Sequence, residues 1–73
     1  PDNVLMRYNF ACVLARRLND AERAIDLLEA IVPGFSLSAY KATVADADLD
    51  RLRDHPRFQK MIAKAAKALG VQG

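Results

Sequence analysis

Between positions 3 and 32, apolar residues recur at the three- and four-residue steps of an α-helix, in two runs separated by Leu18, Asn19 and Asp20. These steps place side chains on one face of a helix. The face of the first run comprises Val4, Tyr8, Ala11, Ala15 and Leu18, and that of the second comprises Ala21, Ala24, Ile25, Leu28, Ile31 and Val32. The alanines in both runs let two helix backbones approach closely. The pattern therefore predicts two helices folded against each other as a hairpin.

The ends of this hairpin carry residues typical of helix caps. Asp2 or Asn3 can accept a hydrogen bond from the first turn of the first helix, which is expected to end near position 17 or 18. Asn19 suits the left-handed conformation that closes a helix, and Asp20 suits the N-cap of the next one. We expect the second helix to end near Val32, because a proline and a glycine follow it.

The remainder of the chain also has helical spacing. Ser36 or Ser38 is expected to begin a short helix that reaches about Ala45, with a buried side of Leu37, Tyr40 and Val44. A helical turn over residues 46–53 follows. Its two leucines, three residues apart, are expected to be buried: Leu49 and Leu52.

His55 and Pro56 mark the start of the last helix, because proline is tolerated at the first helical position. Gly70 is expected to end this helix. Its apolar face is predicted to comprise Phe58, Met61, Ile62, Ala65 and Leu69. The sequence contains no strand pattern, so we predict an all-α fold in a single domain of 73 residues.

The first helix is apolar on more than its hairpin side. Leu5, Met6, Phe10 and Val13, with Leu14, point away from the predicted stripe, and a helix that is apolar around most of its circumference is normally covered on two sides. We expect the isolated chain to self-associate through this helix or to expose an apolar patch. Leu5, Met6, Phe10 and Val13 are therefore the candidate interaction surface.

Composition excludes several classes of protein. The longest apolar run is far shorter than the roughly 20 residues of a membrane span, and no signal peptide opens the chain. The sequence begins without Met, so we expect a piece of a longer, cytoplasmic protein. The single cysteine, Cys12, cannot form an internal disulfide and is interpreted as a small buried hydrophobic residue.

Asp46, Asp48 and Asp50 resemble the start of a calcium-binding EF-hand loop, which then requires Gly at its sixth position and Glu at its twelfth. Arg51 and Arg57 occupy those positions here and would repel the ion. We therefore predict no metal site, and assign the aspartates to helix capping and to pairing with arginines.

Nothing in the sequence predicts catalysis or a cofactor. The hydroxyl residues Ser36, Ser38 and Thr43 have no adjacent base. The three glycines are isolated, so no phosphate-binding loop is present. His55 lies directly before a proline, where a structural role at the helix start is expected.

The charge of +2 arises mainly from the last helix, because no acidic residue follows Asp54. Arg57, Lys60, Lys64 and Lys67 form a secondary basic surface. A solvated helix side is the simplest interpretation, and lysines late in a helix also interact favourably with its dipole. An acidic protein, a nucleic acid or a membrane surface remain open as ligands.

The hairpin resembles a tetratricopeptide repeat (TPR), which has the pattern W-x₂-L-G-x₂-Y, then A-x₃-F, then P. Arg7, Phe10, Ala11 and Leu14 keep the first spacing, with Arg7 in place of the aromatic residue. The second spacing is kept by Ala24 and Leu28. The gap between the two elements is one residue longer than in the family, and the proline comes early.

Residues 46–58 read D-A-D-L-D-R-L-R-D-H-P-R-F. This segment is similar to the C-terminal end of TPR arrays in bacterial signalling proteins, including class III adenylate/guanylate cyclases and Ser/Thr kinases. The resemblance implies one TPR-like module over residues 1–73, with the hairpin at 3–32 and a second, degenerate repeat or cap at 36–69. Any cyclase activity would belong to a separate domain.

Taken together, these features predict a non-catalytic protein–protein interaction module that ends a TPR array. Three partners remain open: upstream repeats, a second copy forming a homodimer, or a separate protein. The alternative function is a small basic helical nucleic-acid-binding domain. Against it, no helix combines base-reading side chains with a clean exposed face.

Overall fold

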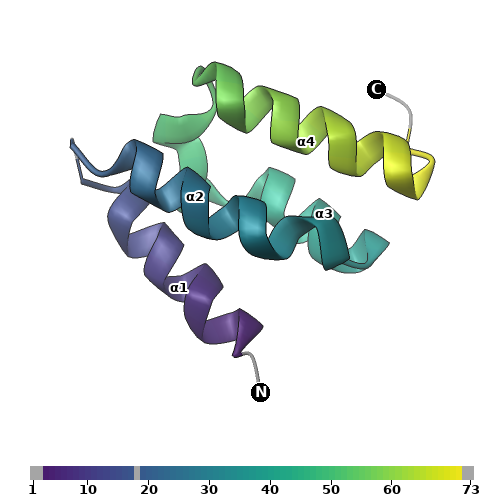
Figure 1. Ribbon diagram of the computed structural model, residues 1–73, viewed down its shortest axis with the longest axis horizontal. Helices are drawn as coiled ribbons and strands as arrows, with labels where there is room; N and C mark the ends of the chain where they lie inside the picture. Colours follow the sequence, from purple (N-terminus) through teal and green to yellow (C-terminus); the bar gives the residue numbers. More distant parts are fainter. Residues whose placement is uncertain (1–2, 18, 72–73) are drawn as a thin grey trace.

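A computed structural model describes residues 3–17 and 19–71, and within these ranges it contains helices and no strand. The predicted all-α fold is therefore confirmed. Figure 1 shows the arrangement of the elements. In chain order they are α1 (Val4–Ala15), α2 (Ala21–Ile31), the 3₁₀-helix η1 (Val32–Gly34), α3 (Leu37–Ala45), the 3₁₀-helix η2 (Ala47–Leu52) and α4 (Pro56–Leu69).

Most helix ends follow the local signals in the sequence. The Asn3 side chain accepts a hydrogen bond from the Met6 backbone N–H at 2.9 Å. Ser36, rather than Ser38, caps α3 by accepting from the Ala39 N–H at 3.2 Å. Gly70 ends α4 in the left-handed conformation, with φ of 74°. These three caps confirm the predicted positions to within one or two residues.

The connection between α1 and α2 differs from the expectation. α1 ends at Ala15, two or three residues before the predicted end. Asn19 is not left-handed, because no non-glycine residue in the described part has a positive φ. Asp20 stands at the N-cap of α2 without a side-chain capping bond, and its carboxylate lies 3.5 Å from the Arg23 guanidinium. The predicted roles of Asp2 and Leu18 fall outside the described residues.

α1 and α2 fold back on each other as the predicted hairpin, and Figure 1 shows the two helices diverging from the end at which they are connected. Ala11, Ala15 and Ala24 are at most 1% exposed. Their small side chains permit the close approach of the two backbones. Leu14 is also buried, at 3% exposure, so our assignment of this residue to the outer side was wrong.

One hydrophobic core joins all the elements. Four large residues at its centre are fully buried: Ile25, Leu28, Leu49 and Leu52. The burial of Leu49 and Leu52 confirms the prediction for residues 46–53, although the segment forms a 3₁₀-helix. α4 contributes Phe58, Met61 and Ala65 to the core, with Ile62 and Leu69 partly buried beside them.

The predicted buried side of the third helix was confirmed for Tyr40 and wrong for Leu37 and Val44. Leu37 and Val44 are exposed, whereas Tyr40 and Thr43 are buried. Both pairs of positions fit a helical stripe, so periodicity alone does not choose between them. Thr43 tolerates burial because its hydroxyl donates a hydrogen bond to the Ala39 carbonyl at 2.9 Å.

Among the helices formed by residues 3–17 and 19–71, none combines the length and the apolar character needed to cross a membrane.

Candidate interaction surface

The outward side of α1 is apolar and uncovered. Met6, Phe10 and Val13 follow one another at four- and three-residue steps, so they share the side of the helix opposite Ala11 and Ala15. Their exposed fractions are 64%, 49% and 38%. Three of the four residues of the sequence-predicted surface therefore form a continuous exposed helical stripe.

Two further apolar residues are exposed at the start of α1. Leu5 is 69% exposed, and Val4, which the sequence placed on the hairpin side, is 43% exposed. Figure 1 shows the N-terminal turns of α1 projecting beyond the other helices, so these turns have fewer neighbours to cover them. Val4 thus has the correct helical position for burial but no packing partner there. Hereafter the α1 surface means Leu5, Met6, Phe10 and Val13.

A hydrogen bond fixes α1 against the start of η2. The Tyr8 hydroxyl donates to Asp46 Oδ2 at 2.6 Å, and the other oxygen of Asp46 accepts from the Asp48 N–H at 2.9 Å. The Tyr8 ring also lies against Phe35, with centroids 6.3 Å apart. Because these contacts hold the inner side of α1, its outer side faces away from the core.

The same contacts determine the ionisation of this cluster. Burial, and then the hydrogen bond to Asp46, raise the pKa of Tyr8 well above its usual range. The hydrogen bond from Tyr8 lowers the pKa of Asp46. Burial raises the pKa of the Cys12 thiol to about 11, so Cys12 is a protonated, weakly nucleophilic thiol at neutral pH.

Three potential metal ligands lie close together beside the Tyr8–Asp46 hydrogen bond. One ligand atom each from Cys12, Asp46 and Asp48 lie within 4.8 Å of one another. All three groups already have structural partners: Asp46 Oδ2 accepts from the Tyr8 hydroxyl and from the Cys12 thiol, and Asp48 lies 3.8 Å from Arg16. These contacts fit an N-terminal cap and a tertiary hydrogen bond, and they do not call for an ion.

The three aspartates that resemble an EF-hand start have separate structural contacts. Asp50 pairs with Arg53 at 2.8 Å, and the Arg53 guanidinium also donates to the Asp46 carbonyl at 2.9 Å. Asp46 has the predicted capping role. Arginine pairing involves Arg53 and, for Asp48, Arg16 rather than the expected Arg51.

His55 acts at the start of α4, as expected from its position before Pro56. Its Nδ1 accepts a hydrogen bond from the Arg57 backbone N–H at 3.2 Å. The imidazole therefore caps one of the free N–H groups of the first helical turn.

The secondary basic surface is divided in the structure. Arg57 approaches α2, where its guanidinium lies 2.6 Å from Asp26, 2.7 Å from Glu29 and 3.3 Å from Glu22. The hydrogen bonds with Glu29 and Asp26 raise the pKa of Arg57 further above its ordinary value. Arg57 thus joins α4 to α2, and its charge is compensated.

Sequence reasoning missed the three acidic partners of Arg57. They recur at four- and three-residue steps along α2, which places all three on one side of that helix. This acidic stripe was the signal that could have predicted a basic partner. Lys60, Lys64 and Lys67 remain exposed along α4 and have no ion pair with any described residue.

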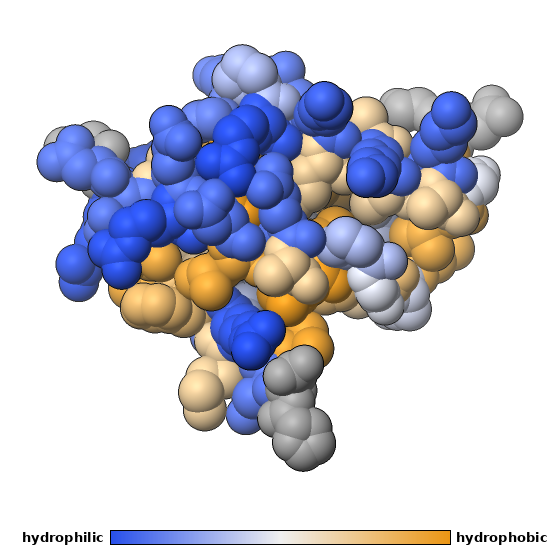
Figure 2. All heavy atoms as spheres, viewed as in Figure 1, coloured by the Kyte–Doolittle hydropathy of each residue, from blue (hydrophilic) through white to orange (hydrophobic). Residues whose placement is uncertain are grey.

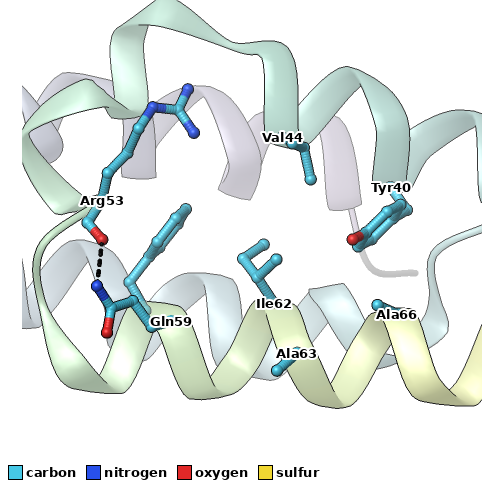
Figure 3. Close-up of a pocket in the computed structure, with 8 residues that line it drawn as sticks. Tyr40, Val44, Arg53, Gln59, Ile62, Ala63 and Ala66 are labelled. Atoms are coloured by element: carbon cyan, nitrogen blue, oxygen red, sulfur yellow. Dashed lines mark hydrogen bonds between the residues drawn. The ribbon is translucent and has the colours of Figure 1, made fainter. Parts of the chain in front are cut away.

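Two grooves flank α4. The first, of about 390 Å³, lies between α3 and α4. Figure 3 shows Tyr40 and Val44 facing Ile62 and Ala66 across it, with Arg53 at one end. The Gln59 amide donates to the Arg53 carbonyl at 3.0 Å. The lining is almost entirely apolar and offers little to orient a polar ligand.

The second groove, of about 620 Å³, lies between α4 on one side and the C-terminal part of α2 with η1 on the other. We call it the α2–α4 groove. Val32, Met61 and Ala65 form part of its apolar lining, and Lys60 and Lys64 stand at its edge. Figure 2 shows apolar residues in the depression between the hydrophilic side chains of α4 and the body of the protein.

Comparison of the chain with protein families, curated proteins and solved structures finds no match.

Proposed function

We propose that this protein is a non-catalytic interaction module that binds an apolar helical face through the α1 surface. The exposure of Met6, Phe10 and Val13 on the side of α1 opposite the hairpin carries this proposal. Isolated exposed apolar residues are common in monomeric proteins, whereas a continuous apolar stripe along a helix is typical of a binding surface.

The partner that fits best is a preceding helical repeat. A repeat in a helical array contacts only its neighbours, and a terminal repeat has one uncovered side. Here the inner side of α1 packs against α2 and η2. An upstream hairpin would cover the outer side. The resemblance to TPR arrays supports this arrangement, and the segment at 46–58 supports a cytoplasmic bacterial signalling protein, such as a nucleotide cyclase, as the parent.

A second copy of the chain or a separate protein could cover the same stripe. The nucleic-acid alternative has weaker support, because Arg57 is paired with carboxylates of α2 and leaves three lysines on α4. Salt-dependent binding to random duplex DNA would favour that alternative.

The test compares two sets of exposed apolar residues. The double variant Met6→Ser, Phe10→Ser changes the α1 surface, and Leu37→Ser is the matched control because Leu37 is similarly exposed on α3. We expect the unmodified chain to self-associate in sedimentation experiments or to bind a hydrophobic dye. The double variant should lose this behaviour and the control should keep it.

In a longer natural chain, the amides and the Phe10 side chain of α1 should become protected from solvent. Hydrogen exchange and the Phe10 ring signals in NMR would measure this protection. A chain that stays monomeric at millimolar concentration and binds no dye, with α1 equally exchangeable when the upstream residues are present, would contradict the proposal.

A further inference from the structure

The α2–α4 groove has an apolar floor. Val32 is 2% exposed, and Met61 and Ala65 are each 7% exposed, so their side chains form the floor from within the core. Phe35 and Leu69 are partly buried and line the groove. A volume of about 620 Å³ with this lining can take several apolar side chains of a ligand.

The edge of the groove along α4 is positive. Lys60 and Lys64 line it, lie one helical turn apart, and have no ion pair within residues 3–17 and 19–71. Arg57 and Glu29 also line the groove, but they are paired with each other at 2.7 Å. The uncompensated charge at this edge is therefore that of the two lysines, and it favours a partner that carries negative charge there.

The dimensions suit a helix. The groove follows α4 from Arg57 to Leu69, which at about 1.5 Å per residue corresponds to roughly 18 Å, or about three turns. A helix in such a groove presents apolar residues at helical spacing to the floor. Its carboxylates would need to lie one turn apart to match Lys60 and Lys64, whereas a fatty acid supplies only one carboxylate.

We propose that the α2–α4 groove binds a short, acidic amphipathic helix of a partner protein. The apolar side of that helix packs on Val32, Met61 and Ala65, and two of its carboxylates pair with Lys60 and Lys64. The α1 helix of a second copy does not fit this description, because Val4–Ala15 contains no acidic residue and includes Arg7.

This site is separate from the α1 surface, so it adds a second binding function to the proposed one. A Phe10→Ser variant should therefore still bind an acidic helix in the α2–α4 groove. Loss of self-association through α1 and loss of groove binding would be observed independently, and failure of either proposal leaves the other testable.

The probe is a labelled synthetic helix of roughly twelve residues, with leucines at helical spacing and two glutamates one turn apart. A control peptide carries lysines in place of the glutamates. Fluorescence anisotropy measures affinity, and NMR titration of the full 73-residue chain locates the site. We expect the acidic peptide to bind, the basic peptide to bind at least about tenfold more weakly, and shifts to centre on Val32, Met61 and Ala65.

Two variants and their matched controls test the contacts. The double variant Lys60→Glu, Lys64→Glu should weaken binding of the acidic peptide by about tenfold. The control double variant Lys41→Glu, Lys67→Glu makes the same change in net charge away from the groove. It should change binding by less than about twofold. Ala68→Trp should fill the groove and weaken binding by about tenfold, with Ala63→Trp on the other side of α4 as control. Circular dichroism checks that each variant is folded.

Equal binding of the two peptides, an equal loss in the matched charge control, or shifts confined to α1 would overturn the proposal. Binding of the lysines to anionic phosphatidylserine vesicles, without binding of the acidic peptide, would also overturn it and would assign the edge to a membrane surface.

Discussion

The two longest helices of the protein, α1 and α4, have opposite outer surfaces. Both bury one side in the same core. The outer side of α4 carries Lys60, Lys64 and Lys67, whereas the outer side of α1 carries Met6, Phe10 and Val13. A charged outer side is stable in water. Covering an apolar outer side with another surface instead lowers the free energy. The outer side of α1 is therefore the one that favours cover by another surface, whereas the lysine-bearing side of α4 is stable when exposed to water.

The largest expected effect comes from the same substitution on the two sides of α1. Leu14 is 3% exposed and Leu5 is 69% exposed. Leu14→Ala should reduce the free energy of unfolding by about 2–5 kcal/mol, because it removes buried methyl groups and leaves a cavity. Leu5→Ala should change it by less than about 0.5 kcal/mol. Urea denaturation of both variants measures this difference, and equal losses would show that Leu5 is covered in solution.

A larger side chain at the contact between α1 and α2 should be enough to disrupt their packing. Ala11 is fully buried, so Ala11→Trp should reduce the free energy of unfolding by about 1–3 kcal/mol through overpacking. Ala30→Trp is the control, because Ala30 is exposed on α2 and should tolerate the larger side chain. An unchanged melting temperature for Ala11→Trp would rule out the hairpin packing.

The hydrogen bond between Tyr8 and Asp46 should appear in the pH dependence of stability. Tyr8→Phe removes the donor and should reduce the free energy of unfolding by about 1 kcal/mol at neutral pH. The folded-state pKa of Asp46 is lowered, so its contribution is fully present above the unfolded-state pKa of about 3.9 and is lost as the pH falls through the folded-state value.

The difference between the unmodified chain and Tyr8→Phe should therefore shrink as the pH falls below about 4. Urea denaturation at a series of pH values measures it. Tyr40→Phe is the control, since the Tyr40 hydroxyl has no hydrogen bond within the described residues. A difference in the free energy of unfolding that stays constant down to pH 2 would show that the Tyr8 hydroxyl does not stabilise the fold through a hydrogen bond to the Asp46 carboxylate.

The smallest expected effect concerns the ion pairs that join α4 to α2. Arg57→Gln should slightly lower the urea midpoint and should reduce its dependence on salt, because exposed ion pairs are weak and screened. Lys64→Gln makes the same change of charge without breaking an ion pair and should leave the midpoint nearly unchanged. The same salt dependence in both variants would mean that the carboxylates of α2 do not hold Arg57 in solution.

The α1 surface, the basic surface of α4 and the α2–α4 groove were predictable from the sequence to different degrees. Met6, Phe10 and Val13 could be assigned because they lie off the helical stripe that faces α2. Arg57 was predicted as part of a free basic surface, and the structure pairs it with α2. The α2–α4 groove was not predicted, because its two walls are segments almost thirty positions apart, and only their packing creates it.

The sequence by itself determined the helices and most of their ends. Asn3, Ser36, His55 and Gly70 act on N–H and carbonyl groups within one turn, so their effect does not depend on the rest of the chain. The tertiary structure decided which side of α3 is buried, where Arg57 points and that Tyr8 reaches Asp46. These outcomes depend on the relative orientation of whole helices, which is set by the shared core and by no single local pattern.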